Sequence, residues 1–359
     1  MDFSLGEDRQ MLVNSLGRFL AGNFDWKTRE QVIASSEGWS RDLWRQLADL
    51  GVIGALFDEE SGGYAGSPFD VGVVFGEVGR ALAVGPFLGT LMAGRVLAAT
   101  GRADLLERVI AGEVILSAAL EAATLRAVVA GDGWSLSGSQ AVVPFAASAD
   151  HIVVAATTAQ GPSLFLVDKG ASGLSIQSYP LVDGGAAGEL RLDGVPATLL
   201  GEAGQAAPII EAVNAVALVG LCWEAVSIMD VVKDQTLEYL RTRKQFGIAI
   251  GKFQALQHRM ATLALEIEQA RSAAINAAAR FQEGRITREK AVSAAKYTIG
   301  RVGTLAAEEA IQLHGGIGMT WELPLSHYAK RLVMIGHQLG DEDHHLERFI
   351  ALGRESAAA

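Results

Sequence analysis

The sequence has little cysteine and a shortage of positive charge. Cys222 is the single cysteine among 359 residues, so no disulfide can form within the chain. This usage fits a reducing compartment, and we expect a cytoplasmic protein. Acidic residues outnumber basic ones by 41 to 30, which gives a formal net charge of −11. A general nucleic-acid binder is not expected, because a phosphate backbone needs a basic face. A small anionic ligand would need only a local basic pocket.

Signals for export and membrane insertion are also missing from the sequence. The first ten residues, MDFSLGEDRQ, lack the basic and apolar regions of a signal peptide. The most apolar stretch runs from Ala207 to Met229, and Glu211, Asn214 and Glu224 interrupt it. Its uncharged part is too short to span a bilayer as a helix. We therefore expect a helix buried inside a soluble bundle and no insertion into a membrane.

Periodicity along the chain predicts three domains. Residues 1–115 carry apolar side chains at helical spacing, such as Leu12, Leu16 and Leu20. Residues 116–202 contain short apolar runs between turns, which predicts closely spaced antiparallel strands in a barrel or sandwich. Residues 203–359 carry long helical stripes with short connections. The expected fold class is α+β multidomain, with an N-terminal helical domain, a middle antiparallel β-barrel or sandwich, and a C-terminal four-helix bundle.

One segment gathers positive charge in this acidic chain. Four cations lie within twelve residues and surround an aromatic residue, Phe246; they are Arg241, Arg243, Lys244 and Lys252. An arginine fork can bind two phosphate oxygens at once, and a phenylalanine ring offers a face for stacking. A basic helix C-terminus explains the same cations, because they favour the negative end of the helix dipole. The residues alone leave both interpretations open.

A second segment joins a helix to a pair of glycines, Gly315 and Gly316, shortly after Gln312. Glycines let a backbone approach a ligand closely, and exposed amides there can meet an anion. The alternative is a plain glycine stop at the end of a helix. The glycine spacing differs from the dinucleotide fingerprint and no strand precedes it, so a Rossmann interpretation fails.

A third segment, from Gly340 to His345, combines carboxylates with two imidazoles. Adjacent histidines on a helix point about 100° apart, so His344 and His345 cannot chelate as a pair one turn apart would. An acidic first turn of a helix explains the same residues, and we expect no metal site. No nucleophile elbow is present, and Cys222 lies in an apolar stretch where thiols are usually inert.

Taken together, these segments resemble the acyl-CoA dehydrogenase family over nearly the whole chain. The specific matches are Arg243-x-Gln245-Phe246-Gly247 with Phe253–Gln254, and Gln312-x-x-Gly315–Gly316-x-Gly318. Within the family, the chain is most similar to the small subunits of pimeloyl-CoA-dehydrogenase-like heteromeric enzymes. That similarity rests on Gly38–Trp39–Ser40 with Leu43–Trp44, on Lys330–Arg331, and on the run from Gly340 to His345.

The resemblance implies oxidation of a CoA thioester at Cα–Cβ, in which a carboxylate removes the α-proton and FAD accepts the β-hydride. In the family the FAD lies between subunits. The residues that would hold its adenine and pyrophosphate end are Arg243, Phe246, Gln254, Gln312, Gly315 and Gly316. The implied partners are a homologous large acyl-CoA dehydrogenase subunit, an acyl-CoA substrate and an electron-transfer flavoprotein.

The sequence departs from the family at the catalytic base. One expected position falls in the stretch from Met334 to Gly340, which contains no carboxylate, and the other is Ala217. Alanine cannot abstract a proton, so the catalytic residue is unknown. Glu224, two helical turns beyond Ala217, is the one substitute candidate considered. The Gly-Ser-Asp segment that the family places beside the flavin ring is absent after Leu120.

Three hypotheses follow from this pattern. In the first, the chain is the non-catalytic small subunit of a heteromeric acyl-CoA dehydrogenase and contributes the adenine-end half of a shared FAD site. In the second, it is a self-sufficient dehydrogenase that uses Glu224 as its base. In the third, it is a flavin-free acyl-CoA-binding or scaffold protein that kept the fold.

Overall fold

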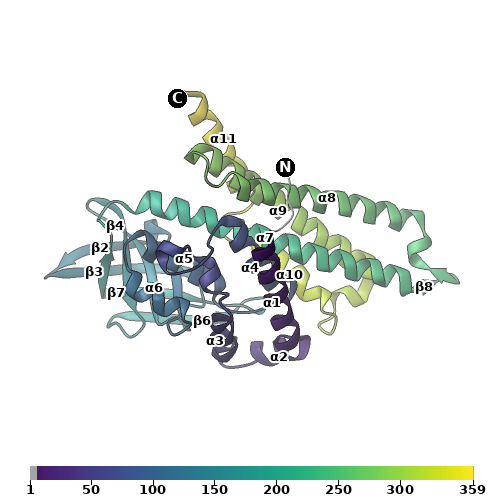
Figure 1. The fold of residues 1–359 in the computed structure, drawn as a ribbon, viewed down its shortest axis with the longest axis horizontal. Helices are drawn as coiled ribbons and strands as arrows, with labels where there is room; N and C mark the ends of the chain where they lie inside the picture. Colours follow the sequence, from purple (N-terminus) through teal and green to yellow (C-terminus); the bar gives the residue numbers. More distant parts are fainter. Residues whose placement is uncertain (1–5, 359) are drawn as a thin grey trace. The chain divides into compact units, whose positions relative to one another are not determined.

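The computed structural model describes residues 6–358, and within that range it contains eleven α-helices and nine strands (Figure 1). The chain divides into two compact units. Unit 1 holds the described residues up to Trp26, Pro68–Ala83 and the chain from Leu218 onward, and unit 2 holds Lys27–Ser67 and Val84–Ala217. Each unit therefore draws on separate stretches of the sequence.

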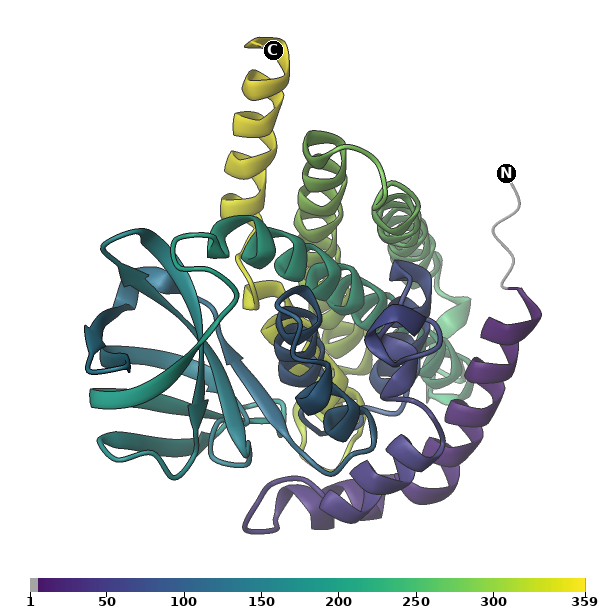
Figure 2. The ribbon, with the colours of Figure 1, turned by 60° about the vertical axis from the view of Figure 1, so that its left-hand side comes forward.

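Unit 2 contains a seven-stranded sheet that closes on itself (Figure 2). Its strands are β1 (Leu116–Ala119), β2 (Leu125–Ala130), β3 (Gly133–Pro144), β4 (His151–Thr158), β5 (Gly161–Asp168), β6 (Leu174–Pro180) and β7 (Ala186–Leu200). Strand β4 pairs with β5, β5 with β7, β7 with β3, β3 with β2, and β2 returns to β4. The ring confirms the predicted β-barrel, and β1 and β6 add to it at β4 and β7.

Two pairings in this sheet are parallel, which the sequence patterns did not indicate. Both β1 and β2 run parallel to β4, whereas the other pairs of the sheet are antiparallel. Only the short 3₁₀ turn η3 (Ala122–Thr124) and two flanking residues separate β1 from β2. So short a link lets both strands continue in one direction along the same neighbour.

The helices of unit 2 are attached to the barrel by aromatic residues and buried polar contacts. They are α2 (Trp26–Ile33), α3 (Arg41–Asp49), α5 (Phe87–Ala99) and α6 (Ala103–Ile110), with 3₁₀ turns η1 (Gly54–Leu56) and η2 (Glu59–Ser61). The Trp39 indole N–H donates to Ser148 Oγ at 2.8 Å, and the Trp44 ring meets Phe87 edge-on at 5.1 Å. These tryptophans, which contributed to the family resemblance, therefore serve the core of unit 2.

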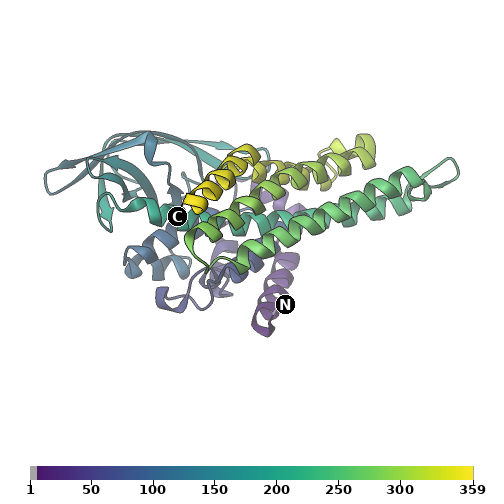
Figure 3. The ribbon, with the colours of Figure 1, turned by 90° about the horizontal axis from the view of Figure 1, so that it is seen from above.

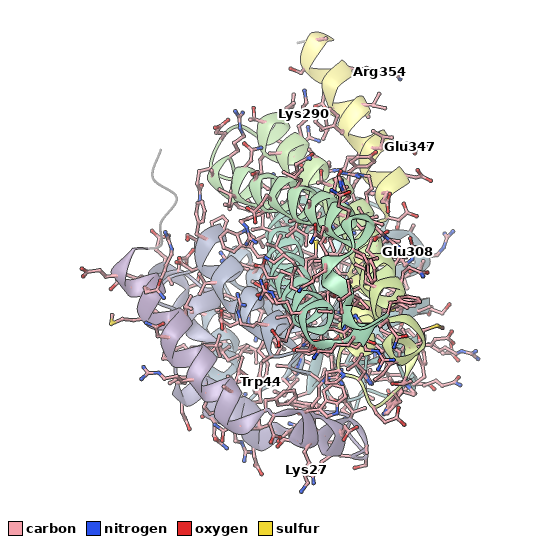
Figure 4. The ribbon with its side chains drawn as sticks, turned by 90° about the vertical axis from the view of Figure 1, so that its right-hand side faces the viewer. Lys27, Trp44, Lys290, Glu308, Glu347 and Arg354 are labelled. Carbon is pink, nitrogen blue, oxygen red and sulfur yellow. The ribbon has the colours of Figure 1, made fainter. Side chains whose placement is uncertain are left out.

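Unit 1 is helical apart from one small hairpin (Figure 3). Its helices are α1 (Glu7–Asn23), α4 (Pro68–Arg80), the larger part of α7 (Ala206–Thr242), α8 (Gln254–Ala279), α9 (Arg285–His314), α10 (Leu325–His337) and α11 (Glu342–Ala358), and its hairpin joins β8 (Lys244–Gln245) to β9 (Ile248–Ala249). The side chains of Met260, Leu263 and Ile267 on α8 are buried. Lys290 of α9 and Arg354 of α11 are labelled in Figure 4, where these two packed helices run side by side.

The helical–β–helical order confirms the predicted fold class, with α11 as a further helix beyond a four-helix C-terminal bundle. The three-domain division at residues 115 and 202 stays a prediction. The barrel strands do lie between Leu116 and Leu200, and α7 begins at Ala206. The two compact units, however, combine helices from both ends of the chain.

Helix α7 is the one helix among the described residues that is long and apolar enough to cross a membrane. In its most apolar window, 78% of the helix is buried inside the protein. The core helix of a soluble protein passes the same test of length and composition, so the match is weak evidence for a membrane span.

Close packing of α4 on α7 requires glycine at Gly72. A Cβ added there would lie 2.6 Å from Cδ2 of Trp223. We expect Gly72→Ala to lower the free energy of unfolding by about 1–3 kcal/mol, the usual cost of overpacking a core. Urea denaturation measures this change. As a control, Gly22→Ala in α1 has no atom within 4 Å of the new methyl group and should be neutral or stabilising by up to about 1 kcal/mol. Equal effects of the two changes would contradict the packing argument.

Candidate functional site

The structure brings the two segments that the sequence predicts to bind a ligand together at one end of unit 1. The Tyr239 ring stacks on His314, with centroids 4.4 Å apart and planes at 25°. Tyr239 lies four residues before Arg243, and His314 lies between Gln312 and Gly315. The end of α7 and the end of α9 are therefore neighbours, although they are distant in the sequence.

A bidentate ion pair joins the start of α8 to the last turns of α9. Arg259 donates to both carboxylate oxygens of Glu309 on α9, at 2.7 and 2.9 Å. Arg259 lies five residues after Gln254, and Glu309 lies three residues before Gln312. The fork geometry of this pair holds the two helices in register. The predicted residues on α8 and α9 consequently belong to one surface region.

The β8–β9 hairpin carries Phe246 at its tip. Phe246 and Gly247 form the two-residue turn, and both have positive φ angles, 54° and 82°. Such angles at both central positions are those of a type I′ hairpin turn, for which glycine is suited and phenylalanine is not. The Phe246 side chain is nevertheless 91% exposed. A strained backbone that displays an apolar ring to solvent indicates a binding role.

The cations around this hairpin are free of internal partners. Arg241, Arg243, Lys244 and Lys252 are exposed, and none forms an ion pair with any residue of the described range 6–358. Attraction to the negative end of the α7 dipole can explain only Arg241, because α7 ends at Thr242 and the other three cations follow it. The region is therefore a positively charged patch on a chain whose net charge is −11.

The glycines after α9 leave the backbone open. Gly315 has a φ of 68° and begins the 3₁₀ turn η5 (Gly315–Met319). A Cβ added at Gly315 or at Gly316 would meet no atom within 4 Å. Gln312 and Gln254 are both exposed beside these segments. Both glycines are exposed and carry no side chain, so a ligand can approach the backbone there, while the Gly315 N–H itself donates to carbonyls of α9.

The acidic segment that follows α10 supports a structural interpretation instead of a metal site. Asp341 accepts the backbone N–H of His344 at 2.9 Å and so caps the start of α11. His345 is buried, and its Nε2 donates to the carbonyl of Leu339 at 3.0 Å. Burial lowers the pKa of His345 to about 4. Residues 6–358 contain no group of three His, Cys, Asp or Glu side chains placed to hold a metal ion.

Neither expected position of the catalytic base provides a carboxylate, and Glu224 is engaged elsewhere. Ala217 is fully buried on α7. Glu224, 4% exposed, accepts two hydrogen bonds from Arg331 of α10, at 2.6 and 2.8 Å. Gly79 of α4 packs against it so closely that an added Cβ would lie 2.8 Å from the Glu224 Cγ. The geometry gives Glu224 the role of a buried structural ion pair between helices.

A fully buried lysine, Lys296, contacts the stretch from Met334 to Gly340, the other expected position of the catalytic base. The sequence patterns did not identify this lysine. Lys296 of α9 donates to the carbonyls of Gly336 and Gly340, at 2.8 and 2.6 Å. It thereby binds the turn that begins at the end of α10, where the dipole favours a cation. Burial lowers its pKa to about 8. The available signal was a lone lysine at an inward position of an alanine-rich helix.

Removal of the Glu224 carboxylate should destabilise the protein. Glu224→Gln removes the charge that binds the partly buried Arg331, and breaking a buried pair costs up to about 5 kcal/mol of unfolding free energy. Urea denaturation measures the loss, and Glu238→Gln, at an exposed position of the same helix, is the control. The double change Glu224→Leu with Arg331→Met should recover most of the stability. Unchanged stability together with lost turnover would instead identify Glu224 as a base.

Lys296 should make stability depend on pH with a defined sign. Between its folded pKa of about 8 and its ordinary value of 10.5, the unfolded chain holds the proton that the folded protein has released. The free energy of unfolding therefore rises with pH, by at most about 1.4 kcal/mol per pH unit. Cys222 opposes this rise above pH 9.0, because burial raises its pKa to about 12.

The measurement for Lys296 is urea denaturation between about pH 7 and pH 9 of the unchanged protein and of Lys296→Met. We expect the difference in unfolding free energy between the two proteins to shift in favour of the unchanged protein as pH rises. Lys290→Met, on the same helix, is the control. A flat difference across this window would contradict a buried ammonium group with a lowered pKa.

Comparisons with known proteins agree with this geometry over the full chain. The family model for the N-terminal domain of acyl-CoA dehydrogenases matches residues 6–113, and the model for the C-terminal domain matches residues 215–348. Acyl-CoA dehydrogenase IpdE2 of Mycobacterium tuberculosis is 31% identical, covering 90% of this chain and 91% of its own length. Acyl-CoA dehydrogenase FadE27 of the same organism is 25% identical, covering 99% of both chains.

Solved structures give the same result. A structure described as a variant of the Tcur3481-Tcur3483 steroid ACAD has a TM-score of 0.91 and 33% identity, covering 99% of this chain and 100% of that one. The ChsE4-ChsE5 complex from Mycobacterium tuberculosis has a TM-score of 0.91 and 25% identity, covering 100% of both chains. The closed barrel, the helical units and these matches together show that the chain belongs to the acyl-CoA dehydrogenase family.

Proposed function

We propose that this chain is the non-catalytic subunit of a heteromeric, FAD-dependent acyl-CoA dehydrogenase. It contributes the adenine-end half of an FAD site, and a homologous large subunit holds the flavin ring and supplies the base. The observation that carries the proposal is Phe246, an exposed ring on a strained turn beside cations that form no ion pair with the described residues 6–358.

The exposed residues fit the adenine and pyrophosphate end of FAD. Phe246 offers a stacking face for the adenine, and the Arg243 fork suits pyrophosphate oxygens. The exposed backbone at Gly315 and Gly316, which has no side chain, allows close approach of the same part of the cofactor. When bound, FAD would supply the acceptor for the hydride from the β-carbon of the thioester. These groups are exposed on unit 1, and we assign the rest of the cofactor to another chain.

The absence of an available carboxylate supports a base on the partner. Ala217 cannot abstract a proton, and Glu224 is bound by Arg331. The turn from Gly336 to Gly340 contains no carboxylate, and its carbonyls at both ends bind the buried Lys296. Two similar solved structures carry two protein names each, Tcur3481-Tcur3483 and ChsE4-ChsE5, and the second is described as a complex, which supports pairing with another chain.

The same neighbour suggests which substrates to test first. The Tcur3481-Tcur3483 protein is described as a steroid ACAD, so polycyclic acyl-CoA thioesters are the first class to assay here. We propose an electron-transfer flavoprotein as the electron acceptor and the cytoplasm as the location, in keeping with the single buried Cys222.

Flavin content of the complex tests the proposal. The chain purified alone should be colourless, whereas the complex co-expressed with its large subunit should carry about one flavin per pair of chains. Phe246→Ala or Arg243→Ala should weaken flavin retention by about tenfold or more, since one stacking or charged contact is worth about 1–3 kcal/mol. Arg45→Ala removes an exposed arginine elsewhere and should leave the flavin spectrum unchanged.

Two results would contradict the shared site. A lone chain that is yellow and bleaches on addition of an acyl-CoA would be a complete enzyme. A colourless complex that still binds CoA esters by calorimetry would be a flavin-free acyl-CoA-binding assembly.

A further inference from the structure

The imidazole of His314 is nearly enclosed by the protein at the end of α9. We call the residues assigned to the adenine end of FAD the half-site; they are Arg243, Phe246, Gln254, Gln312, Gly315 and Gly316. His314 is the last residue of α9 and lies between two of them, Gln312 and Gly315. The residue is only 6% exposed, and its ring stacks on Tyr239. No role in the half-site follows from the sequence patterns for this histidine.

One ring nitrogen of His314 has a partner inside the protein, and this contact fixes the position of the proton. The Nδ1 atom lies 2.8 Å from the carbonyl oxygen of Ala310. A carbonyl oxygen can only accept a hydrogen bond, so Nδ1 carries the hydrogen and donates it. Burial lowers the pKa of His314, which favours the neutral ring. In a neutral imidazole whose Nδ1 is protonated, the Nε2 atom has no hydrogen and is an acceptor.

The Nε2 atom of His314 receives no hydrogen bond from the protein. No residue in the described range 6–358 donates to it. Nor is Nε2 one of the fully enclosed side-chain atoms of that range that lack a partner, so solvent reaches it. Gly315 follows His314 directly and is exposed, so a molecule can approach there over backbone that carries no side chain. An acceptor on an otherwise enclosed ring is therefore open at the half-site.

Two contacts hold this ring in place before a ligand binds. The Tyr239 ring lies 4.4 Å from it, with the two planes at 25°. Gly318 of η5 packs beside it, and a Cβ added at Gly318 would lie 3.1 Å from the Cβ of His314. A side chain that is ordered in advance loses little conformational entropy when it forms a new hydrogen bond. The acceptor is accordingly preorganised.

We propose that His314 Nε2 accepts a hydrogen bond from the adenosine half of the cofactor and so contributes specificity at the half-site. This inference rests on the proposed function, because that function brings FAD to Gly315 and Gly316. The adenosine half carries two kinds of donor, the 6-amino group of adenine and the ribose hydroxyls. An unprotonated nitrogen can bind either of them, whereas it discriminates against an analogue in which the donor is missing or is replaced by an acceptor.

Flavin analogues that each lack one donor test this inference. The analogues are the hypoxanthine form of FAD, in which a carbonyl replaces the 6-amino group, and its 2′-deoxy and 3′-deoxy adenosine forms. They are titrated by flavin fluorescence into the co-expressed complex after its flavin has been removed. We expect the unchanged complex to bind one of these analogues about three- to tenfold more weakly than FAD, which is the value of one hydrogen bond between neutral groups.

The variant His314→Phe separates the acceptor from the packing. It keeps a flat ring to stack on Tyr239 but has no acceptor, so it should bind FAD about three- to tenfold more weakly and lose the preference over the analogue. A merely structural role for the ring would leave that preference intact. His151→Phe, on β4 of unit 2, is the matched control and should keep both the affinity and the preference.

Nitrogen NMR of the lone chain with labelled histidine adds a measurement that needs neither flavin nor partner. At about pH 7 it should show His314 as a neutral ring that is protonated at Nδ1 and unprotonated at Nε2. A proton on Nε2 would overturn the inference, because that atom could then only donate.

The outcomes separate this inference from the function on which it rests. Weak binding of the hypoxanthine form identifies the 6-amino group as the donor, and weak binding of a deoxy form identifies a hydroxyl. Equal affinity of the unchanged complex for FAD and all three analogues would overturn the inference and leave the proposed function standing, with Nε2 bound to water only. A preference that persists in folded His314→Phe would overturn it as well. If the unchanged complex takes up no flavin, the proposed function and the inference fail together.

Discussion

The stacking of Tyr239 on His314 is the contact on which the candidate site depends. It joins the end of α7 to the end of α9 at 4.4 Å between ring centres, and Arg259 adds α8 through its bidentate pair with Glu309. Without this arrangement, the basic hairpin and the glycine turn would be unrelated features on separate helices. With it, an exposed aromatic ring, several cations that form no ion pair within residues 6–358, and two exposed glycines share one end of unit 1.

Three buried ionisable groups of unit 1 form hydrogen bonds that connect its helices and turns. Glu224 is bound by Arg331, Lys296 by two carbonyls of the turn after α10, and His345 by a third. A catalytic base must be accessible and close to the proton that it removes. Glu224 and Lys296, which are already bound inside the protein, do not meet that condition, and this agrees with a subunit that relies on a partner for the chemistry.

Some of the exposed apolar residues of unit 1 lie on the segments that carry the half-site. Phe246 is displayed on a turn that strains its backbone, and Met319 and Trp321 expose most of their side chains. Strain and apolar exposure both cost free energy in the isolated chain, so their presence on adjoining segments is explained most simply by contacts in an assembly.

Local patterns in the sequence determined the succession of helices, strands and helices, because the 3.6-residue and two-residue periods of apolar side chains are properties of neighbouring residues. They also showed the basic segment, the glycine pair and the lack of a carboxylate at Ala217. The tertiary structure alone decided which distant residues meet. Arg331 binds Glu224, which lies 107 residues earlier in the sequence. Lys296 binds the carbonyls of Gly336 and Gly340, which lie 40 and 44 residues later. Strands β1 and β2 both run parallel to β4. Such pairings follow from how whole elements pack, and no periodicity within a single segment encodes them.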